Sequence, residues 1–238
     1  MKWGFLSPLH FVTIIFACAV IISLHCILRH RSEKVQMITL LCLSTICLFN
    51  VAHGLIFSSN ILEALPLHMC EINALLLPAA ILTRNKTVNN LLLLWSLGAI
   101  AAIVVNSAQA NYEILSITFF KYYFSHVFEF GIPILMFSLG LVKKDPKCIR
   151  STLTITVIAY TLVHHVNMAI NHFGQYLVGK ECNVNYMYSI TPKNPVFDLF
   201  YAIIPSPYWY LFLALPIVLI YLMFVYWKQL NFHKRKPS

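Results

Sequence analysis

Seven long apolar stretches dominate this sequence and restrict the folds open to it. Each has about the length of roughly 20 residues that an α-helix needs to cross a bilayer, and none alternates apolar and polar residues as a transmembrane β-strand does. Only 11% of the 238 residues are charged and 59% are hydrophobic, whereas a soluble domain carries about 25% charged residues. The sequence therefore predicts an all-α, polytopic integral membrane protein with seven transmembrane helices. The expected spans are 9–28, 35–57, 61–82, 88–106, 117–142, 149–171 and 208–227.

The Lys and Arg residues are distributed unevenly among the loops that these spans define. Cytoplasmic loops of membrane proteins carry an excess of Lys and Arg. One side of the expected bundle holds only Lys2, Lys121, Lys180 and Lys193. The other side holds Arg29, Arg31, Lys34, Arg84, Lys86, Lys143, Lys144, Lys147, Arg150, Lys228, Lys234, Arg235 and Lys236. We expect a multi-pass protein of the cell membrane with its N-terminus outside and its C-terminus in the cytoplasm.

This distribution accounts for the net charge of +9 through membrane topology. A nucleic-acid partner would need a clustered basic face with groove-reading or stacking residues, and the sequence has no such element. The chain 1–238 is expected to be a single transmembrane domain. Its longest segment outside the spans, 173–207, is rich in aromatic residues and is expected to be an outer loop that covers a site as a lid. A short helix is expected within it, over residues 196–204.

Polar residues interrupt four of the apolar stretches. A charged or imidazole side chain in the hydrocarbon region is costly, so each one requires a partner, a watery cavity or a function. The predicted topology places all of these residues in the outer half of the bilayer, which indicates one polar cavity that opens outward. They are Asn50, His53, His68, Cys70, Glu71, Asn73, His126, Glu129, His164, His165, Asn167 and Asn171.

Helical spacing sharpens this expectation. His68 and Glu71 are three residues apart, as are His126 and Glu129, so each pair is expected to share one helix face. His164, Asn167 and Asn171 follow the spacing i, i+3, i+7 and form one stripe. Simple charge compensation and interhelical hydrogen bonds, worth about 0.6 kcal/mol each, are the structural alternative to a functional site.

Three ordered motifs resemble a known family: Leu65-Pro66-Leu67-His68-Met69-Cys70, Phe124-Ser125-His126, and the segment from Asn183 to Pro192. The chain resembles the YwaF-like bacterial membrane proteins, which are similar to the vertebrate transmembrane protein 164 acyltransferase family. The resemblance implies about seven helices and acyl transfer onto phospholipids through a reactive Cys and a His. His68 and His126 match the family's histidines. The family's Cys directly precedes the His, a position that is Leu67 here, while Cys70 follows two residues after the His.

The first functional hypothesis is therefore a membrane-embedded, acyltransferase-like enzyme of lipid metabolism whose partner is a membrane lipid. The candidate catalytic residues are His68, Cys70, Glu71, His126 and Glu129. In this hypothesis His126 is the base, Glu129 or Glu71 orients a His, and Cys70 or the substrate itself is the nucleophile. It predicts no cofactor and no metal. The candidate substrate-binding residues are His164, Asn167, Asn171, Asn185 and Tyr186.

Two other functions remain open at the level of sequence. His68, His126, His164 and His165 with Glu71 or Glu129 could ligate the Zn²⁺ of an intramembrane lipid hydrolase. An outer cavity lined by His, Asn and Glu would also suit a carrier or binding protein for a small or lipid solute. Metal content would separate the two enzymes, and proton-coupled uptake would identify the carrier.

Overall fold

The computed structural model describes residues 1–105 and 107–232, and every regular secondary-structure element in these residues is a helix. The 3-10 helices carry the label η. The elements are α1 (Pro8–Leu28), α2 (Glu33–Phe57), η1 (Ile61–Glu63), α3 (Met69–Thr83), α4 (Lys86–Val104), η2 (Ser107–Gln109), α5 (Ile117–Ser138), α6 (Cys148–Val178), η3 (Tyr186–Tyr188), α7 (Pro195–Ile203), η4 (Trp209–Ala214) and α8 (Leu215–Phe232). The all-α expectation is confirmed for this part of the chain. Lys234, Arg235 and Lys236 lie outside the described residues.

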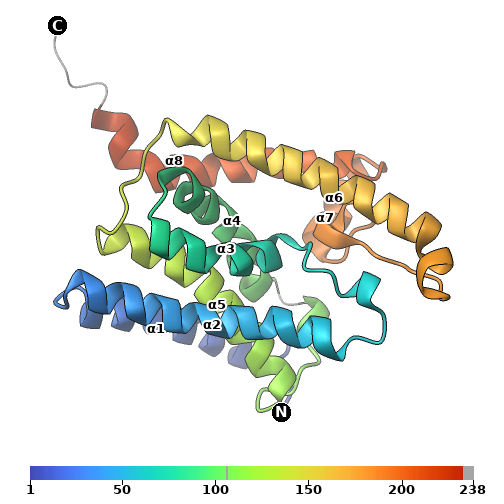
Figure 1. The fold of residues 1–238 in the computed structure, drawn as a ribbon, viewed down its shortest axis with the longest axis horizontal. Coiled ribbons are helices and arrows are strands. Elements are labelled where there is room, and N and C mark those ends of the chain that lie inside the picture. Colours follow the sequence, from blue (N-terminus) through green and yellow to red (C-terminus); the bar gives the residue numbers. More distant parts are fainter. Residues whose placement is uncertain (106, 233–238) are drawn as a thin grey trace, which may run out of the picture.

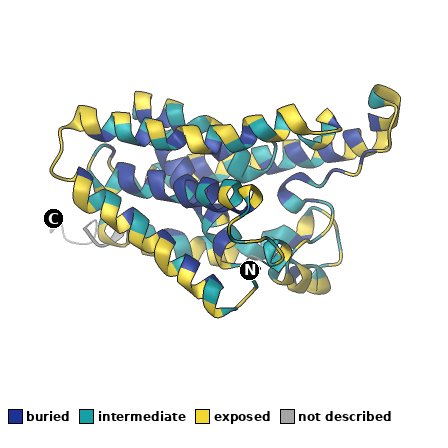
Figure 2. Ribbon diagram, turned by 90° about the horizontal axis from the view of Figure 1, so that it is seen from below, coloured by how far each residue is buried: buried dark blue, intermediate teal, exposed yellow. Residues whose placement is uncertain are grey.

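The long helices pack in three layers (Figure 1). Helices α1 and α2 form one outer layer, α6 and α8 form the other, and α3, α4 and α5 lie between them. Helix α4 is the most enclosed of the long apolar helices, because 56% of its most apolar window is buried, against 17–22% in α1, α2, α6 and the segment Trp209–Gln229. Figure 2 shows the same contrast, with buried residues in the middle and exposed residues on the outward faces of the outer helices.

Within the described residues, five segments are long and apolar enough to cross a membrane: α1, α2, α4, α6 and Trp209–Gln229. In the described part of the chain a helix lies close to each of the seven expected spans, but α3 has only 15 residues, too few to cross a bilayer as one helix. Helix α5 is not among the five, and it carries Lys121, His126 and Glu129 among its 22 residues. The structure thus supports an all-helical membrane protein with five candidate spans. The short helix expected over 196–204 is present as α7.

The expectation that a helix runs through residues 61–82 was wrong for its first part. After η1 the chain passes through bends without regular secondary structure, and α3 begins only at Met69. Pro66 lacks a backbone N–H and disfavours helical backbone at the residue before it. His68 is the N-cap of α3, and its backbone N–H donates to Glu71 Oε2 at 3.0 Å. His68 and Glu71 are therefore an N-terminal capping pair and do not share a helix face as expected.

Two glycines permit close contacts between helices and their neighbours. A Cβ at Gly131 of α5 would lie 2.0 Å from Cδ1 of Ile21 on α1. A Cβ at Gly174 of α6 would lie 2.6 Å from Sγ of Cys182, in the loop that follows α6. Glycine at these positions lets α1 pack directly on α5, and lets the loop return along α6.

Candidate active site

A cluster of three reactive side chains lies between α3 and α5. His126 and Glu129, three residues apart on α5, share a face as the sequence predicts, with His126 Nε2 3.9 Å from Glu129 Oε2. Cys70, in the first turn of α3, completes the cluster, since one ligand atom from each of the three residues lies within 4.8 Å of the others. His126 and Glu129 are buried, with side-chain exposures of 8% and 2%. The cluster therefore sits inside the protein, away from its outer surface.

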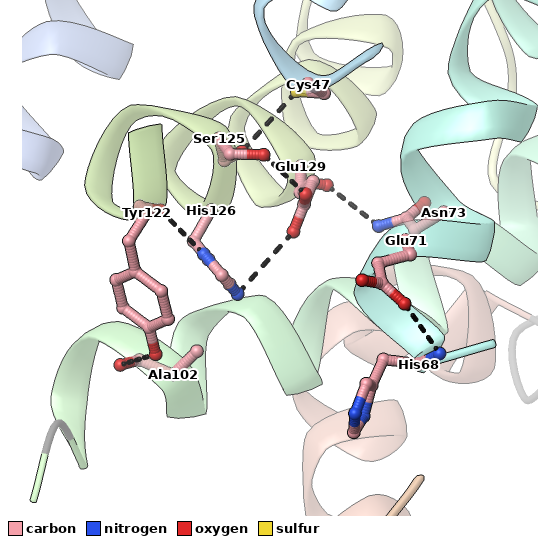
Figure 3. Close-up of polar contacts among 9 residues, drawn as sticks. All are labelled: Cys47, His68, Glu71, Asn73, Ala102, Tyr122, Ser125, His126 and Glu129. Atoms are coloured by element: carbon pink, nitrogen blue, oxygen red, sulfur yellow. Dashed lines mark hydrogen bonds and ion pairs between the residues drawn. The ribbon is translucent and has the colours of Figure 1, made fainter. Parts of the chain in front are cut away.

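A backbone carbonyl places one proton of the His126 ring on Nδ1 (Figure 3). His126 Nδ1 lies 2.7 Å from the carbonyl oxygen of Tyr122, one turn earlier. A carbonyl only accepts hydrogen bonds, so Nδ1 must carry the proton. The Tyr122 ring packs on the imidazole at a centroid distance of 4.3 Å, and its hydroxyl donates to the carbonyl of Ala102 on α4. In the neutral ring the lone pair of Nε2 therefore faces the carboxylate of Glu129.

Glu129 is held at both its side chain and its backbone. Ser125 Oγ donates to Glu129 Oε1 at 2.8 Å. Pro133 lies four residues after Glu129 and has no N–H, so the carbonyl of Glu129 lacks its usual helical donor. Asn73 Nδ2 on α3 fills that role at 3.1 Å. In these two residues, the buried acceptors Glu129 Oε2 and Asn73 Oδ1 receive no hydrogen bond from the described part of the chain.

A polar pocket of about 360 Å³ opens beside His68. His68 Nδ1 accepts a hydrogen bond from the backbone N–H of Met187 at 3.2 Å. The imidazole lies between the rings of Tyr186 and Tyr188, at centroid distances of 5.4 and 5.3 Å. Burial raises the pKa of Tyr188 to about 12, so its hydroxyl stays protonated at neutral pH. The pocket is lined by Glu63, His68, Ala108, Asn183, Val184, Asn185, Tyr186, Tyr188 and Lys193.

The polar stripe on α6 holds the loop that forms one wall of this pocket. Asn167 donates to the carbonyl of Tyr186 at 2.8 Å and accepts from its N–H at 3.0 Å. Asn171 makes the same pair of hydrogen bonds with Val184, at 2.9 and 2.7 Å. The side-chain amides of Asn167 and Asn171 thus form hydrogen bonds with the backbone of alternate loop residues, as the backbone of a neighbouring β-strand would. The loop segment is thereby fastened along α6.

Two more α6 residues that the sequence brought forward have local partners. His164 Nδ1 lies 3.0 Å from Ser189 Oγ in the same loop. His165 is exposed, and its Nδ1 lies 2.8 Å from the carbonyl of Thr161. Asn185 Oδ1 accepts from the N–H groups of Ile190 and Thr191, within the loop. Among the described residues, neither His164 nor His165 joins a group of potential metal ligands.

Sequence reasoning missed three supports of the cluster: the Ser125 hydroxyl, the Tyr122 carbonyl and the contact of Asn73 with a freed carbonyl. Two of them leave a signal in the sequence. Ser125 lies four residues before Glu129 and Tyr122 lies four residues before His126, which is the spacing of helix neighbours. The contact of Asn73 depends on the packing of α3 against α5 and has no local signature.

The apolar helices and the Cys70–His126–Glu129 cluster define a class: an all-helical membrane protein with three potential metal-ligating side chains gathered among its helices. The family model described as "TMEM164 family" matches residues 5–227. The chain therefore belongs to the TMEM164 family, as its resemblance to the transmembrane protein 164 proteins implies. No curated protein and no solved structure matches it.

Proposed function

We propose that this protein is a membrane-embedded, acyltransferase-like enzyme that modifies lipids, and that Cys70, His126 and Glu129 form its reactive centre. The observation that carries the proposal is the convergence of a thiol, an imidazole nitrogen and a carboxylate oxygen within 4.8 Å of one another. Two of these groups are almost fully buried. Burying such groups is costly unless they serve one another or a ligand.

The arrangement suits the transfer of an acyl group from one oxygen to another. The hydroxyl oxygen of an acceptor attacks the acyl carbonyl carbon of a donor ester and loses its proton. The bond from that carbon to the donor oxygen breaks, and the donor oxygen takes up a proton as it leaves. The unprotonated Nε2 of His126 and the carboxylate of Glu129 are the groups that can hold the proton or stabilise positive charge during this exchange.

The pocket beside His68 offers a place for the polar part of a lipid. Its walls carry an acid, Glu63, and a base, Lys193, together with the pocket-lining pair Asn185 and Tyr186. His68 borders this pocket. The same residue is the N-cap of α3, whose first turn carries Cys70. Asn167, Asn171 and His164 act in this proposal by holding the loop in place, and the outer half of the bilayer remains the proposed depth of the site.

A second candidate is a metal-dependent lipid hydrolase, because the same cluster has the atoms of a metal-ligand set. In that enzyme water replaces the acceptor hydroxyl, so the product is a free fatty acid. The two candidates share their residues and differ in the acceptor.

The test is lipid acyl transfer by the purified chain in proteoliposomes that contain a phospholipid with a labelled acyl chain and an unlabelled lysophospholipid. Mass spectrometry then measures label in the acceptor and in free fatty acid. We expect label in the acceptor, and at least a 100-fold lower rate in His126→Ala and Glu129→Gln. His165→Ala, a change at an exposed histidine, is the control and should leave the rate unchanged. Wild-type rates in His126→Ala, or no labelled product from the wild type, would overturn the proposal.

A further inference from the structure

Two buried oxygen atoms beside the reactive cluster are left without a donor. Glu129 Oε2 and Asn73 Oδ1 make no hydrogen bond, and the two residues are 2% and 0% exposed. Leaving one such acceptor buried and unsatisfied costs about 1–3 kcal/mol, and more if it is charged. In the part of the chain that the structure describes, the basic side chain that comes within 4.0 Å of this carboxylate is that of His126, whose Nε2 lies 3.9 Å from Oε2. A cation in this space would satisfy the carboxylate.

The donor atoms around the space are those of a zinc site. A thiolate sulfur, an imidazole nitrogen and a carboxylate oxygen are the three ligand types that Zn²⁺ takes in proteins, and catalytic zinc sites use three protein ligands. With zinc–ligand distances of about 2.0–2.3 Å, tetrahedral ligands lie roughly 3.3–3.8 Å apart. The observed spread is up to 4.8 Å, so a bound ion would draw these atoms about 1 Å closer together.

The hydrogen bonds behind the cluster are also those of a metal site. A metal-bound histidine usually donates its other ring N–H to a backbone carbonyl or a carboxylate, and a metal-bound carboxylate is itself hydrogen-bonded. His126 meets the first condition through the Tyr122 carbonyl at 2.7 Å. Glu129 meets the second through Ser125 Oγ, which donates to Oε1 and leaves Oε2 free.

We propose that Cys70 Sγ, His126 Nε2 and Glu129 Oε2 bind one Zn²⁺ ion. This proposal rests on the proposed function only for the reaction that the ion serves. In the zinc-bound enzyme His126 Nε2 and Glu129 Oε2 would act as ligands instead of proton acceptors, and the ion would promote the loss of the proton from the acceptor hydroxyl. Three protein ligands leave the fourth position open for a hydroxyl group, whose pKa the ion lowers. The ligand set differs from the one that the sequence indicated, because it adds Cys70 and leaves out His164 and His165.

The first test is elemental analysis of the full-length chain, purified in detergent, incubated with Zn²⁺ and passed through a desalting column. We expect about one zinc per chain in the wild type, and at least a fivefold lower zinc content in Cys70→Ser, His126→Ala and Glu129→Gln. Cys182→Ala, a change at another buried thiol, and His165→Ala are matched controls that should keep the wild-type content. Less than about one tenth of an equivalent in the folded wild type would overturn the proposal, as would full zinc content in all three ligand variants.

A second measurement needs no variant, which matters if a ligand variant fails to fold. Titration of the metal-free wild type with Co²⁺ should give a thiolate-to-cobalt charge-transfer band that saturates at one equivalent. Absence of this band excludes Cys70 as a ligand. If the protein binds no metal but transfers acyl groups in a His126-dependent reaction, the zinc site is refuted and the proposed function stands. If it binds one zinc but shows no acyl transfer, the zinc site stands and the proposed function fails.

Discussion

The hydrogen bond between Asn73 and the carbonyl of Glu129 can be tested by a double-mutant cycle. The reasoning is that Pro133 removes the helical donor of this carbonyl and that Asn73 Nδ2, at 3.1 Å, takes its place. Asn73→Ala should leave the carbonyl buried and unsatisfied. Interhelical hydrogen bonds in membrane proteins are worth about 0.6 kcal/mol on average and up to about 1.7. We expect a loss of about 1–2 kcal/mol in the free energy of unfolding.

In the Pro133→Ala background the same change should cost much less. That substitution restores a backbone N–H four residues after Glu129, so its carbonyl regains a donor within α5. We expect Asn73→Ala to cost under about 0.5 kcal/mol there, which gives a coupling energy of about 1 kcal/mol between positions 73 and 133.

The assay is reversible unfolding in mixed micelles with increasing SDS, followed by tryptophan fluorescence. Asn50→Ala, at a partly exposed asparagine of α2 whose side chain makes no hydrogen bond with the described residues, is the matched control. It should show no coupling to Pro133→Ala. If Asn73→Ala costs the same in both backgrounds to within about 0.3–0.5 kcal/mol, the account of the freed carbonyl is refuted.

Two further predictions concern the loop along α6. Asn167→Ala removes three hydrogen bonds, two to the Tyr186 backbone and one to Ser189 Oγ. It should lower the free energy of local opening of the loop by about 2–4 kcal/mol. Hydrogen exchange at the Tyr186 amide measures this free energy, and unchanged exchange would contradict the role of Asn167. Gly174→Ala should lower stability by about 1–3 kcal/mol, because its Cβ would meet Cys182 Sγ at 2.6 Å. Cys182→Gly should reverse most of this loss in a thermal melt, and an additive result would refute the steric explanation.

The sequence located the helices of this protein better than it located their contacts. Continuous apolar runs predict helices because only a helix satisfies its own backbone in lipid, and α1, α2 and α4 begin and end within a few residues of the expected bounds. The expected start of α3 was wrong, because the proline and the capping pair determine the backbone conformation there, and hydrophobicity does not. Helix α6 continues to Val178, seven residues beyond its expected end, where Gly179 adopts a positive φ of 69° and ends it.

In the candidate site, too, the sequence predicted a contact within one helix better than contacts between separate segments. The pairing of His126 with Glu129 follows from a spacing of three on one helix, so the sequence was sufficient to predict it. The role of Asn167 and Asn171 was harder to predict. Their helical spacing in the sequence is the same whether the amides line a cavity or bind a loop. Their hydrogen-bonding groups are taken up by the backbone of Tyr186 and Val184.

By itself, the sequence determined that this chain is helical and apolar enough for a membrane, and that His126 and Glu129 lie together on one helix face. Hydrophobicity and helical periodicity are local properties, and both can be read from one segment at a time. Only the tertiary structure decided that Cys70 completes the cluster and that Asn73 reaches the carbonyl of Glu129. Those contacts depend on how α3 is rotated and placed against α5, which the packing of all three layers sets and no single segment encodes.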